Sequence, residues 1–335
     1  MNTDKILLAH GSGGKLTHRL IQEVFLEAFR NEVLEELGDS AVFNIGAGKL
    51  AYTTDAYVVD PIFFPGGDIG RLSVCGTVND LAMMGAKPLY LSASFIIEEG
   101  FGLTELKTIL GSMKDAAIEA GIKIVCGDTK VVPKGFADKI FITTSGIGLI
   151  PPGIEISPRK IMAGDAVIIS GTIGDHGMAI LSQRQGLGFG SSIISDAAPL
   201  NHLVASMVEV VGNGIHALRD PTRGGVATTL NEFAQAANLG IRIYEDRIPI
   251  RDEVKGACEL LGFDPLYVAN EGKLVIVTSK ASVVLPCLMG NSFGVNAQII
   301  GEVVEQHKGM VSLVTRIGGT RIVDMLTGEQ LPRIC

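Results

Sequence analysis

The chain has 335 residues, of which 47% are hydrophobic and 19% are charged, and its formal net charge is -8 at pH 7. This length favours two domains over one, and the composition supplies a sizeable core and argues against a disordered chain. The acidic balance, with a pI of about 5.3, argues against a surface for nucleic acid or for an anionic membrane.

The cysteines and the lack of long apolar runs indicate a cytoplasmic location. The five cysteines are odd in number and form no C-x-x-C pair. We interpret Cys75, Cys126, Cys258 and Cys287 as small core residues in a reducing cytosol, not as zinc ligands or disulfide partners. The sequence contains no signal-peptide pattern and no apolar run of membrane-spanning length. We therefore expect a cytoplasmic protein without nucleic-acid or membrane partners.

The first motif is glycine-rich and precedes a helical pattern. Its residues are His10-Gly11-Ser12-Gly13-Gly14-Lys15. Apolar residues at i, i+4 spacing over 16–29 predict an amphipathic helix. Unpaired N–H groups and the helix dipole make such a turn an anion-binding arrangement. The motif matches neither a Walker A loop nor GxGxxG, so a flexible N-terminal arm over 1–38 is an equally good interpretation.

Residues 39–150 are predicted to form the first domain. Runs rich in β-branched residues predict strands at 50–59, 89–97, 122–125 and 139–150. Helices are predicted at 68–84, with Asp68 as the N-cap, and at 104–120. This alternation is typical of an α/β layer.

A second domain is predicted over 151–323, after the linker Pro151-Pro152-Gly153. Strands are predicted at 166–170, 241–244, 274–277 and 298–304. The segment 171–177 is a glycine-rich turn before a helix. Asp220-Pro221 is predicted to begin another helix, with Asp at the N-cap, Pro at N1 and residues 222–225 in the first turn.

The last segment, 324–335, shows no helical or strand period and ends in Cys335. One interpretation is a frayed terminus whose last residue happens to be cysteine. The other is a swinging thiol, because twelve extended residues can span up to ~40 Å. An ordinary thiol, with a pKa of about 8.5, is only slightly ionised at neutral pH. Such a sulfur suits a carrier that is activated elsewhere better than a self-sufficient nucleophile.

Three acids lie at strand or helix ends of the first domain, namely Asp55, Asp80 and Asp128. Each alone is well explained as a cap or a turn residue. Asp80, however, lies in the apolar stretch of its helix, where an unpaired carboxylate is costly to bury. Together the three suit Mg²⁺, a hard ion that takes oxygen ligands and bridges phosphates.

Three basic residues follow glycine- or proline-rich turns, namely Lys130, Lys134 and Arg223. Arg223 is predicted in the first turn of a helix, where the dipole disfavours a cation unless an anion binds. A surface arginine and a phosphate-binding arginine are equally good interpretations. Glu271, before a predicted strand, is a candidate for an isolated catalytic carboxylate, although a turn acid explains it as well.

These segments together resemble the HypE family of hydrogenase expression/formation proteins, within the PurM-like ATP-binding superfamily. The resemblance covers nearly the whole chain, and the terminal Pro332-Arg333-Ile334-Cys335 is its most discriminating part. The other segments that carry it are His10 to Gly14, Thr54 to Ala56, Gly76 to Ala86, Gly127 to Val132, and Asp220 to Gly225.

The resemblance implies a PurM-like α/β fold, in which the N-terminal half-sheets of two subunits pair into a barrel across a homodimer. It implies that Cys335 receives a carbamoyl group from HypF. ATP then dehydrates this S-carboxamide to a thiocyanate, and the cyano group passes to iron on the HypC–HypD complex for [NiFe]-hydrogenase. Phosphorylation makes the amide oxygen a better leaving group, since it departs as phosphate.

The resemblance also implies roles for individual residues. Mg²⁺ would be held by Asp55, Asp80 and Asp128. Glu271 is the expected base for the amide nitrogen, and Lys134 would stabilise the oxyanion or phosphate. The residues expected to bind ATP are His10, Gly11, Ser12, Gly13, Gly14, Asn79, Lys130, Asp220 and Arg223.

Two alternatives stay open at this point. The first is another enzyme of the superfamily: aminoimidazole ribotide synthetase, selenophosphate synthetase or thiamine-monophosphate kinase. None of these needs a terminal thiol, and the selenium enzyme needs a reactive Cys or selenocysteine near its glycine loop, whereas no cysteine precedes Cys75 here. The second is a non-catalytic scaffold that binds ATP only to set its shape.

Overall fold

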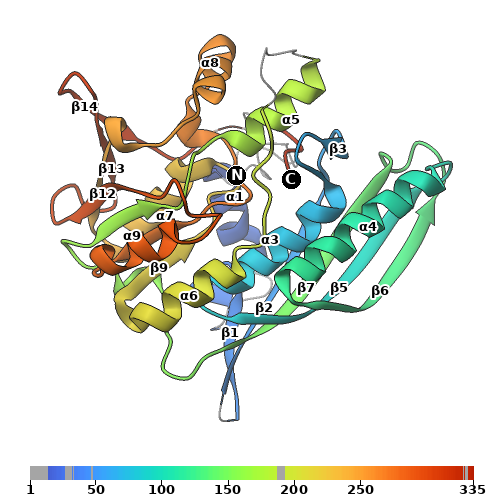
Figure 1. The fold of residues 1–335 in the computed structure, drawn as a ribbon, viewed down its shortest axis with the longest axis horizontal. Coiled ribbons are helices and arrows are strands. Elements are labelled where there is room, and N and C mark those ends of the chain that lie inside the picture. The colour runs from blue at the N-terminus through green and yellow to red at the C-terminus, as the bar shows by residue number, and fades with distance from the viewer. Residues whose placement is uncertain are drawn as a thin grey trace.

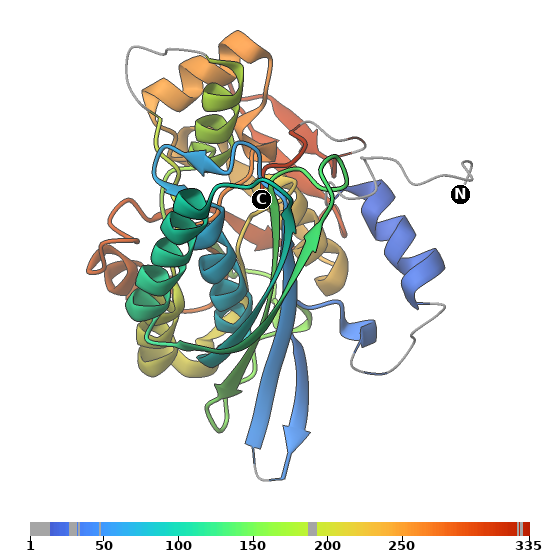
Figure 2. The same ribbon diagram turned by 90° about the vertical axis from the view of Figure 1, so that its right-hand side faces the viewer.

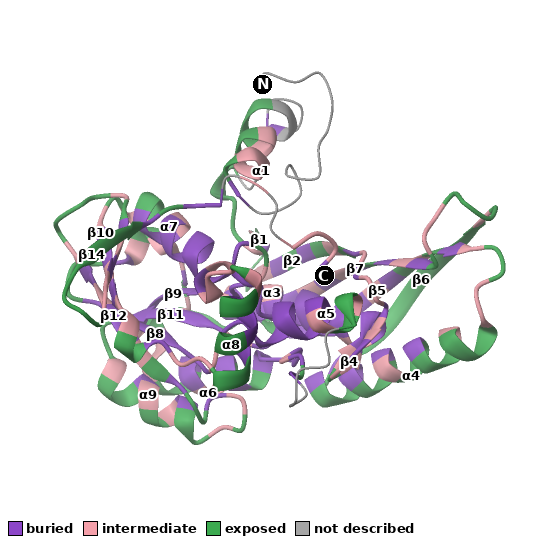
Figure 3. Ribbon diagram, turned by 90° about the horizontal axis from the view of Figure 1, so that it is seen from above, coloured by how far each residue is buried: buried purple, intermediate pink, exposed green. Residues whose placement is uncertain are grey.

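The structure is a computed structural model that describes residues 14–26, 32, 34–46, 48–186, 193–326, 328 and 331–335. Two α/β units lie side by side, and helix α3 (Ile69–Met83) lies between them (Figures 1 and 3). No described helix has both the length and the apolar character that crossing a bilayer demands.

The first unit is a five-stranded sheet in the order β1-β2-β7-β5-β6. Strands β5 and β6 are parallel, and the other neighbours are antiparallel. Helices α3 and α4 (Leu103–Ala120) cover one face of this sheet (Figure 2). The strands are β1 Ala41–Ile45, β2 Gly48–Tyr57, β5 Lys87–Glu98, β6 Lys123–Val132 and β7 Ile140–Ile150, with a small ribbon of β3 Phe63–Phe64 and β4 Gly67–Asp68.

The second unit is a seven-stranded sheet in the order β14-β13-β10-β12-β8-β11-β9. Its strands are β8 Ala166–Ile169, β9 Ile215–Arg219, β10 Gly240–Tyr244, β11 Val275–Thr278, β12 Gln298–Val304, β13 Val311–Val314 and β14 Thr320–Val323. Its helices are α5 Asp175–Gln185, α6 Asn201–Val211, α7 Gly225–Ala237, α8 Asp252–Leu261 and α9 Ala281–Met289. Short 3₁₀ turns occur at Leu34–Glu36, Pro158–Lys160, Gly212–Gly214, Glu245–Arg247 and Pro265–Tyr267.

The N-terminal helix is shorter in its regular part than the pattern over 16–29 predicts. Helix α1 spans Lys15–Leu20 and continues as a π-helical turn, Ile21–Phe25. It stands at the side of the molecule (Figure 3) and is tied to the second unit by His18, whose Nε2 lies 2.8 Å from Glu232 Oε1. His10, Gly11, Ser12 and Gly13 lie outside the described residues.

The predictions for the two helices of the first unit are confirmed to within one residue. Asp68 is the N-cap of α3, and its Oδ1 accepts hydrogen bonds from Gly70 N at 2.7 Å and Arg71 N at 3.1 Å. Nearly every residue of α3 is buried, because both units pack on it. Polar side chains on this helix therefore need partners within the protein.

The prediction that α7 begins at Asp220 is wrong. The helix begins at Gly225, and residues 220–223 form a loop before it. Gly224 and Gly225 have φ angles of +78° and +61°, in the left-handed region that favours glycine. A Cβ on Gly225 would lie 2.5 Å from Leu266 O, so the chain approaches its neighbour too closely for any larger residue.

Two further predictions need correction on strand β6. The strand predicted at 122–125 continues to Val132, so the segment 126–130 that follows the predicted strand also pairs with β5. Cys126, predicted in the core, is exposed, and Cys287 is only partly buried, whereas Cys75 and Cys258 are buried. Strand β6 is an edge strand with both faces exposed along most of its length, so it has no alternating pattern to predict it.

Asn79 joins the two units across their interface. Its Nδ2 donates to Ala198 O at 3.0 Å and to Glu271 O at 3.2 Å, and its Oδ1 accepts from Leu200 N at 2.8 Å. All three partners belong to backbone of the second unit. The Asn79 amide therefore holds the chain around Glu271 and the start of α6 against α3.

We expect Asn79→Ala to lower the free energy of unfolding by about 3 kcal/mol, because each buried backbone group left unpaired costs about 1–3 kcal/mol. Urea unfolding measures this change. Asn44→Ala, at an exposed position of β1, is the control and should stay within about 0.5 kcal/mol of wild type. Equal effects of the two substitutions would show that Asn79 does not fasten the units together.

Candidate functional site

The candidate site is a set of carboxyl groups where the two units meet. Asp55 lies near the end of β2, Asp80 in α3, Asp220 in the loop after β9, and Glu271 in the loop before β11. Removal from water, followed by the negative charges of Asp55 and Asp220, raises the pKa of Asp80 well above its usual range. Removal from water, followed by Asp39 and Asp55, raises the pKa of Asp220 to about 8. Four chain segments thus bring mutually repelling acids together.

Hydroxyl groups orient the two acids of the first unit. Tyr57 Oη donates to Asp55 Oδ2 at 2.9 Å, and Thr53 Oγ1 donates to Asp80 Oδ2 at 2.8 Å. The Tyr57 hydroxyl also lies 3.3 Å from Thr77 Oγ1 of α3. Since Thr53, Asp55 and Tyr57 alternate on one face of β2, the period of the strand directs all three toward α3.

Glu271 is fixed by its backbone, while one oxygen of its carboxyl group has no hydrogen-bond partner among the described residues. Its N–H donates to Asp196 Oδ1 at 3.1 Å, and Asp196 Oδ2 accepts from Lys273 Nζ at 3.0 Å. Its Oε1 is buried and has no hydrogen-bond partner in the part of the chain that the structure describes. Burial and the charges of Asp220 and Asp196 raise the pKa of Glu271 well above its usual range. An unpaired buried carboxyl with a perturbed pKa is typical of a catalytic group.

The C-terminal segment enters this site. Cys335 is half-buried, and Ile334, at 4% exposure, packs in the core of the first unit. Burial raises the pKa of the Cys335 thiol to about 12, with Arg223 opposing the shift and Glu271 adding to it. The pKa of Arg223, an exposed residue, is raised first by its electrostatic interaction with Cys335 and then by the negative charges of Asp55 and Glu271. The docked position of 331–335 is incompatible with a frayed end.

The structure places three of the predicted residues away from this set. Asp128 and Lys130 are exposed on β6, where Lys130 Nζ lies 3.3 Å from Asp128 Oδ2. In the order β2-β7-β5-β6, β6 is about 14 Å from β2. Lys134 is exposed in the turn between β6 and β7. Among the described residues, no three His, Cys, Asp or Glu side chains form a group able to hold a metal ion. The role of Asp128 as a ligand stays a prediction.

Sequence reasoning gave no role to Asn270, although it stands next to Glu271. Its Oδ1 accepts from Gly174 N at 2.7 Å, and its Nδ2 donates to Pro221 O at 3.0 Å. It therefore ties the glycine-rich turn before α5 to the loop that carries Asp220 and Arg223. A polar residue adjacent to a candidate catalytic acid was the available signal.

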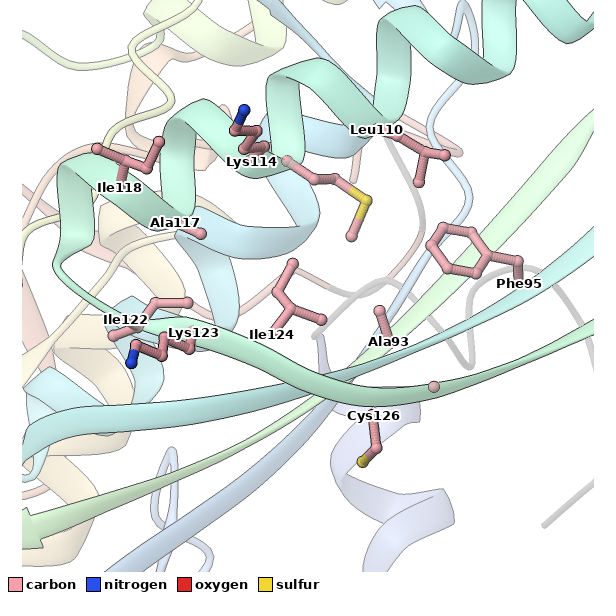
Figure 4. A pocket seen from close by; sticks show the side chains of 12 residues that line it. Ala93, Phe95, Leu110, Lys114, Ala117, Ile118, Ile122, Lys123, Ile124 and Cys126 are labelled. Atoms are coloured by element: carbon pink, nitrogen blue, oxygen red, sulfur yellow. The ribbon is translucent and has the colours of Figure 1, made fainter.

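A separate groove of about 570 Å³ lies between α4 and strands β5 and β6 (Figure 4). Its walls are mostly apolar, and its more polar lining residues are Lys114, Lys123 and Cys126. None of the residues predicted to carry chemistry lines it. The set of carboxyl groups where the two units meet, which we call the acidic seam, is therefore the candidate active site, and this groove is not.

Comparison with known proteins decides the family. The model for the N-terminal domain of AIR synthase related proteins matches residues 37–150, and the model for their C-terminal domain matches 162–314. Carbamoyl dehydratase HypE of Bradyrhizobium diazoefficiens is 55% identical over 330 residues, which cover 98% of this chain and 95% of that protein. The chain belongs to the HypE family. A second HypE protein, from Cupriavidus necator, is 53% identical over 338 residues, 100% of this chain and 96% of that one.

Solved HypE structures have the same fold. One in a HypE–HypF complex has a TM-score of 0.87 and 51% identity, and covers 92% of this chain and 99% of that chain. One of HypE in complex with ATP has a TM-score of 0.83 and 50% identity, and covers 99% of this chain and 100% of that chain. A thiamine monophosphate kinase of Aquifex aeolicus, at 18% identity and a TM-score of 0.65, shares the fold alone; the alignment covers 93% of this chain and 99% of that chain.

The Asp220 carboxyl makes stability depend on pH. In the folded protein it keeps its proton up to a pKa of about 8, whereas an unfolded Asp releases its proton near pH ~3.9. Between these values the unfolded chain binds fewer protons, so the free energy of unfolding falls as pH rises, by up to ~1.4 kcal/mol per pH unit. We expect Asp220→Asn to flatten this fall between about pH 5 and pH 8, measured by urea unfolding without metal or nucleotide.

Asp252→Asn, at an exposed position of α8, is the control and should keep the wild-type pH dependence. If Asp220→Asn keeps it too, the pKa of Asp220 is not raised in the folded protein, which would contradict the electrostatic description of the site given above.

Proposed function

We propose that this protein is an ATP-dependent carbamoyl dehydratase that acts on its own C-terminal cysteine during [NiFe]-hydrogenase maturation. The carrying observation is the docked C-terminus: Val58 N donates to Cys335 O at 3.0 Å, and the charges of Arg223, Glu271 and Asp55 act on the Cys335 thiol. Relatives about 50% identical over the whole chain are carbamoyl dehydratases, and one solved relative binds ATP. The docked position of the tail supports the same function independently, because it brings the proposed substrate group to the acid set.

The acid set fits a magnesium–nucleotide complex. Mg²⁺ keeps several waters and needs only one or two protein carboxylates besides phosphate oxygens. Asp55 and Asp80 would supply these carboxylates. Lost solvation raises the pKa of both, and the negative charges of Asp55 and Asp220 add to the shift of Asp80; a divalent cation would favour the ionised form of each. When bound, Mg²⁺ neutralises charge on the transferred phosphoryl group. Arg223 would contact the phosphates. Asp128, as a metal ligand, and Lys130 would act on the metal–nucleotide complex from the exposed strand β6. Residues 10–14 would bind the nucleotide.

The reaction converts an S-carboxamide into a thiocyanate. The amide oxygen leaves with the γ-phosphoryl group of ATP as phosphate, and the nitrogen gives up both of its protons as the C≡N bond forms. Glu271 accepts a proton from the nitrogen, since a carboxylate with a raised pKa is a stronger base. Lys134 would stabilise phosphate oxygens, and its turn reaches the tail through the ion pair of Asp138 with Arg333.

Exposed apolar side chains support the proposed homodimer. The sheet face opposite α3 and α4 exposes Tyr52, Tyr90, Ile96 and Leu149. A second copy that pairs its half-sheet here would cover this face and close a barrel. HypF would donate the carbamoyl group, as the HypE–HypF complex of a relative suggests, and HypC–HypD would accept the cyano group. The free state of all five cysteines fits a cytoplasmic location.

Intact-protein mass tests the proposed function. With the carbamoyl donor, HypF and ATP, the wild-type chain should gain one carbamoyl group and then lose one water. Cys335→Ala should bind ATP normally and gain no adduct, and Cys126→Ala, at another accessible thiol, is the control that should behave as wild type. A wild-type chain that gains no adduct, or keeps the carbamoyl group unchanged, would support the scaffold alternative.

Glu271→Gln should slow dehydration of the loaded chain by about 10²–10⁴-fold, because a positioned general base contributes that factor. Single-turnover mass analysis with ATP measures the rate. Glu259→Gln, whose side chain is 69% exposed on α8, should leave the rate unchanged. An undiminished rate in Glu271→Gln would remove this residue from the mechanism.

A further inference from the structure

We propose that helix α5 carries a main-chain clasp, formed by Arg184 and His176, that positions the C-terminal segment as substrate. This inference rests on the proposed function. Arg184 and His176 carried no predicted role in the sequence, and they are not part of the acid set. Figure 1 shows the C-terminus beside α5 and β3.

Every carbonyl of residues 332–335 accepts a hydrogen bond from the body of the protein. The Pro332 and Arg333 carbonyls accept from Arg184, and the Ile334 carbonyl accepts from His176. Asp60 N donates to Arg333 O at 3.2 Å, and Val58 N donates to Cys335 O at 3.0 Å. The segment thus runs antiparallel to the irregular chain that follows β2.

Arg184 donates hydrogen bonds to two chain segments at once, the tail and the segment after β2. Its Nη1 donates to Pro332 O and its Nη2 to Arg333 O, both at 2.7 Å, while its Nε donates to Asp60 O at 2.8 Å. The planar guanidinium presents these donors in a fixed fork. It therefore joins the tail to the segment after β2 in one register, and a one-residue slip of the tail would break both tail contacts.

His176 fixes the tail two turns farther along α5. Its Nε2 lies 2.7 Å from Ile334 O and its Nδ1 lies 2.8 Å from Ser195 Oγ. The Ile334 carbonyl can only accept, so Nε2 carries the proton and the Ser195 hydroxyl donates to Nδ1. Because Arg184 is near the end of α5 and His176 near its start, the tail runs antiparallel to the helix and toward Glu271.

The tail itself bends to meet this clasp. Arg333 has a φ angle of +52°, which non-glycine residues rarely adopt. Its side chain donates to Val58 O at 2.8 Å and pairs with Asp138. These contacts hold the bend that turns Cys335 into the site. Arg184 and His176 are positioning residues, since they contact the tail backbone and not the sulfur.

The clasp predicts that a substitution in it affects dehydration but not carbamoylation. Loading by HypF needs an accessible thiol, whereas dehydration needs the docked one. Arg184→Gln should therefore leave the rate of carbamoylation undiminished. It should slow single-turnover dehydration by about 100-fold, the effect of a misplacement near 1 Å.

Alkylation of the unloaded full-length protein by a maleimide gives a readout independent of catalysis. The C-terminal peptide, followed by mass after digestion, should react at least about 10-fold faster in Arg184→Gln than in wild type, since the ratio of docked to released tail falls tenfold for every ~1.4 kcal/mol lost. Arg184→Lys keeps the charge but not the fork, so it should behave like Arg184→Gln. Arg242→Gln, at a partly exposed arginine of β10, is the control expected to match wild type.

Faster alkylation and slower dehydration with loading intact would support the clasp. Wild-type rates in Arg184→Gln or in Arg184→Lys would overturn it. So would a parallel loss of all rates together with a lower unfolding midpoint, which indicates a purely structural role. If wild type itself does not dehydrate, the proposed function fails, whereas the alkylation rates still decide whether the clasp exists.

Discussion

The repulsion among carboxyl groups at the seam of the two units is the constraint on which the rest of the structure depends. Asp55, Asp80, Asp220 and Glu271 come from both units, and burial raises the pKa of each, with neighbouring negative charge adding to the shift for Asp80, Asp220 and Glu271. Such an arrangement costs free energy in the empty protein. In the proposed reaction, Mg²⁺ and the Arg223 guanidinium supply positive charge that would relieve it.

The C-terminal segment determines where the Cys335 thiol can react. In the proposed reaction, the terminal thiol reaches HypF for loading and then reaches the site between the two units. Main-chain hydrogen bonds suit this exchange, because each contributes about 0.5–1.5 kcal/mol and several together can hold the segment while remaining reversible. Burial of the Cys335 thiol raises its pKa to about 12, so the docked sulfur is protonated and unreactive. Loading therefore belongs to the released segment, and dehydration to the docked one.

Much of the fold could be predicted from local patterns, and the failures have physical causes. The N-cap of α3 at Asp68 was visible because capping is local. The start of α7 was misplaced because Asp-Pro is a good helix beginning unless later glycines are left-handed, as Gly224 and Gly225 are. Strand β6 was underestimated because an edge strand with two exposed faces has no period. Motifs indicated Glu271 and Arg223, but Arg184 makes its contacts to backbone far along the chain, which no local pattern encodes.

The most direct test of the central claim is a structure of the Cys335-carbamoylated protein with Mg²⁺ and a non-hydrolysable ATP analogue. We predict that the tail stays docked between β2 and α5. The amide oxygen should then lie within about 3.5 Å of the γ-phosphorus, the separation expected of a reactive arrangement. A loaded tail found outside the seam, or an amide nitrogen out of reach of Glu271, would contradict the account.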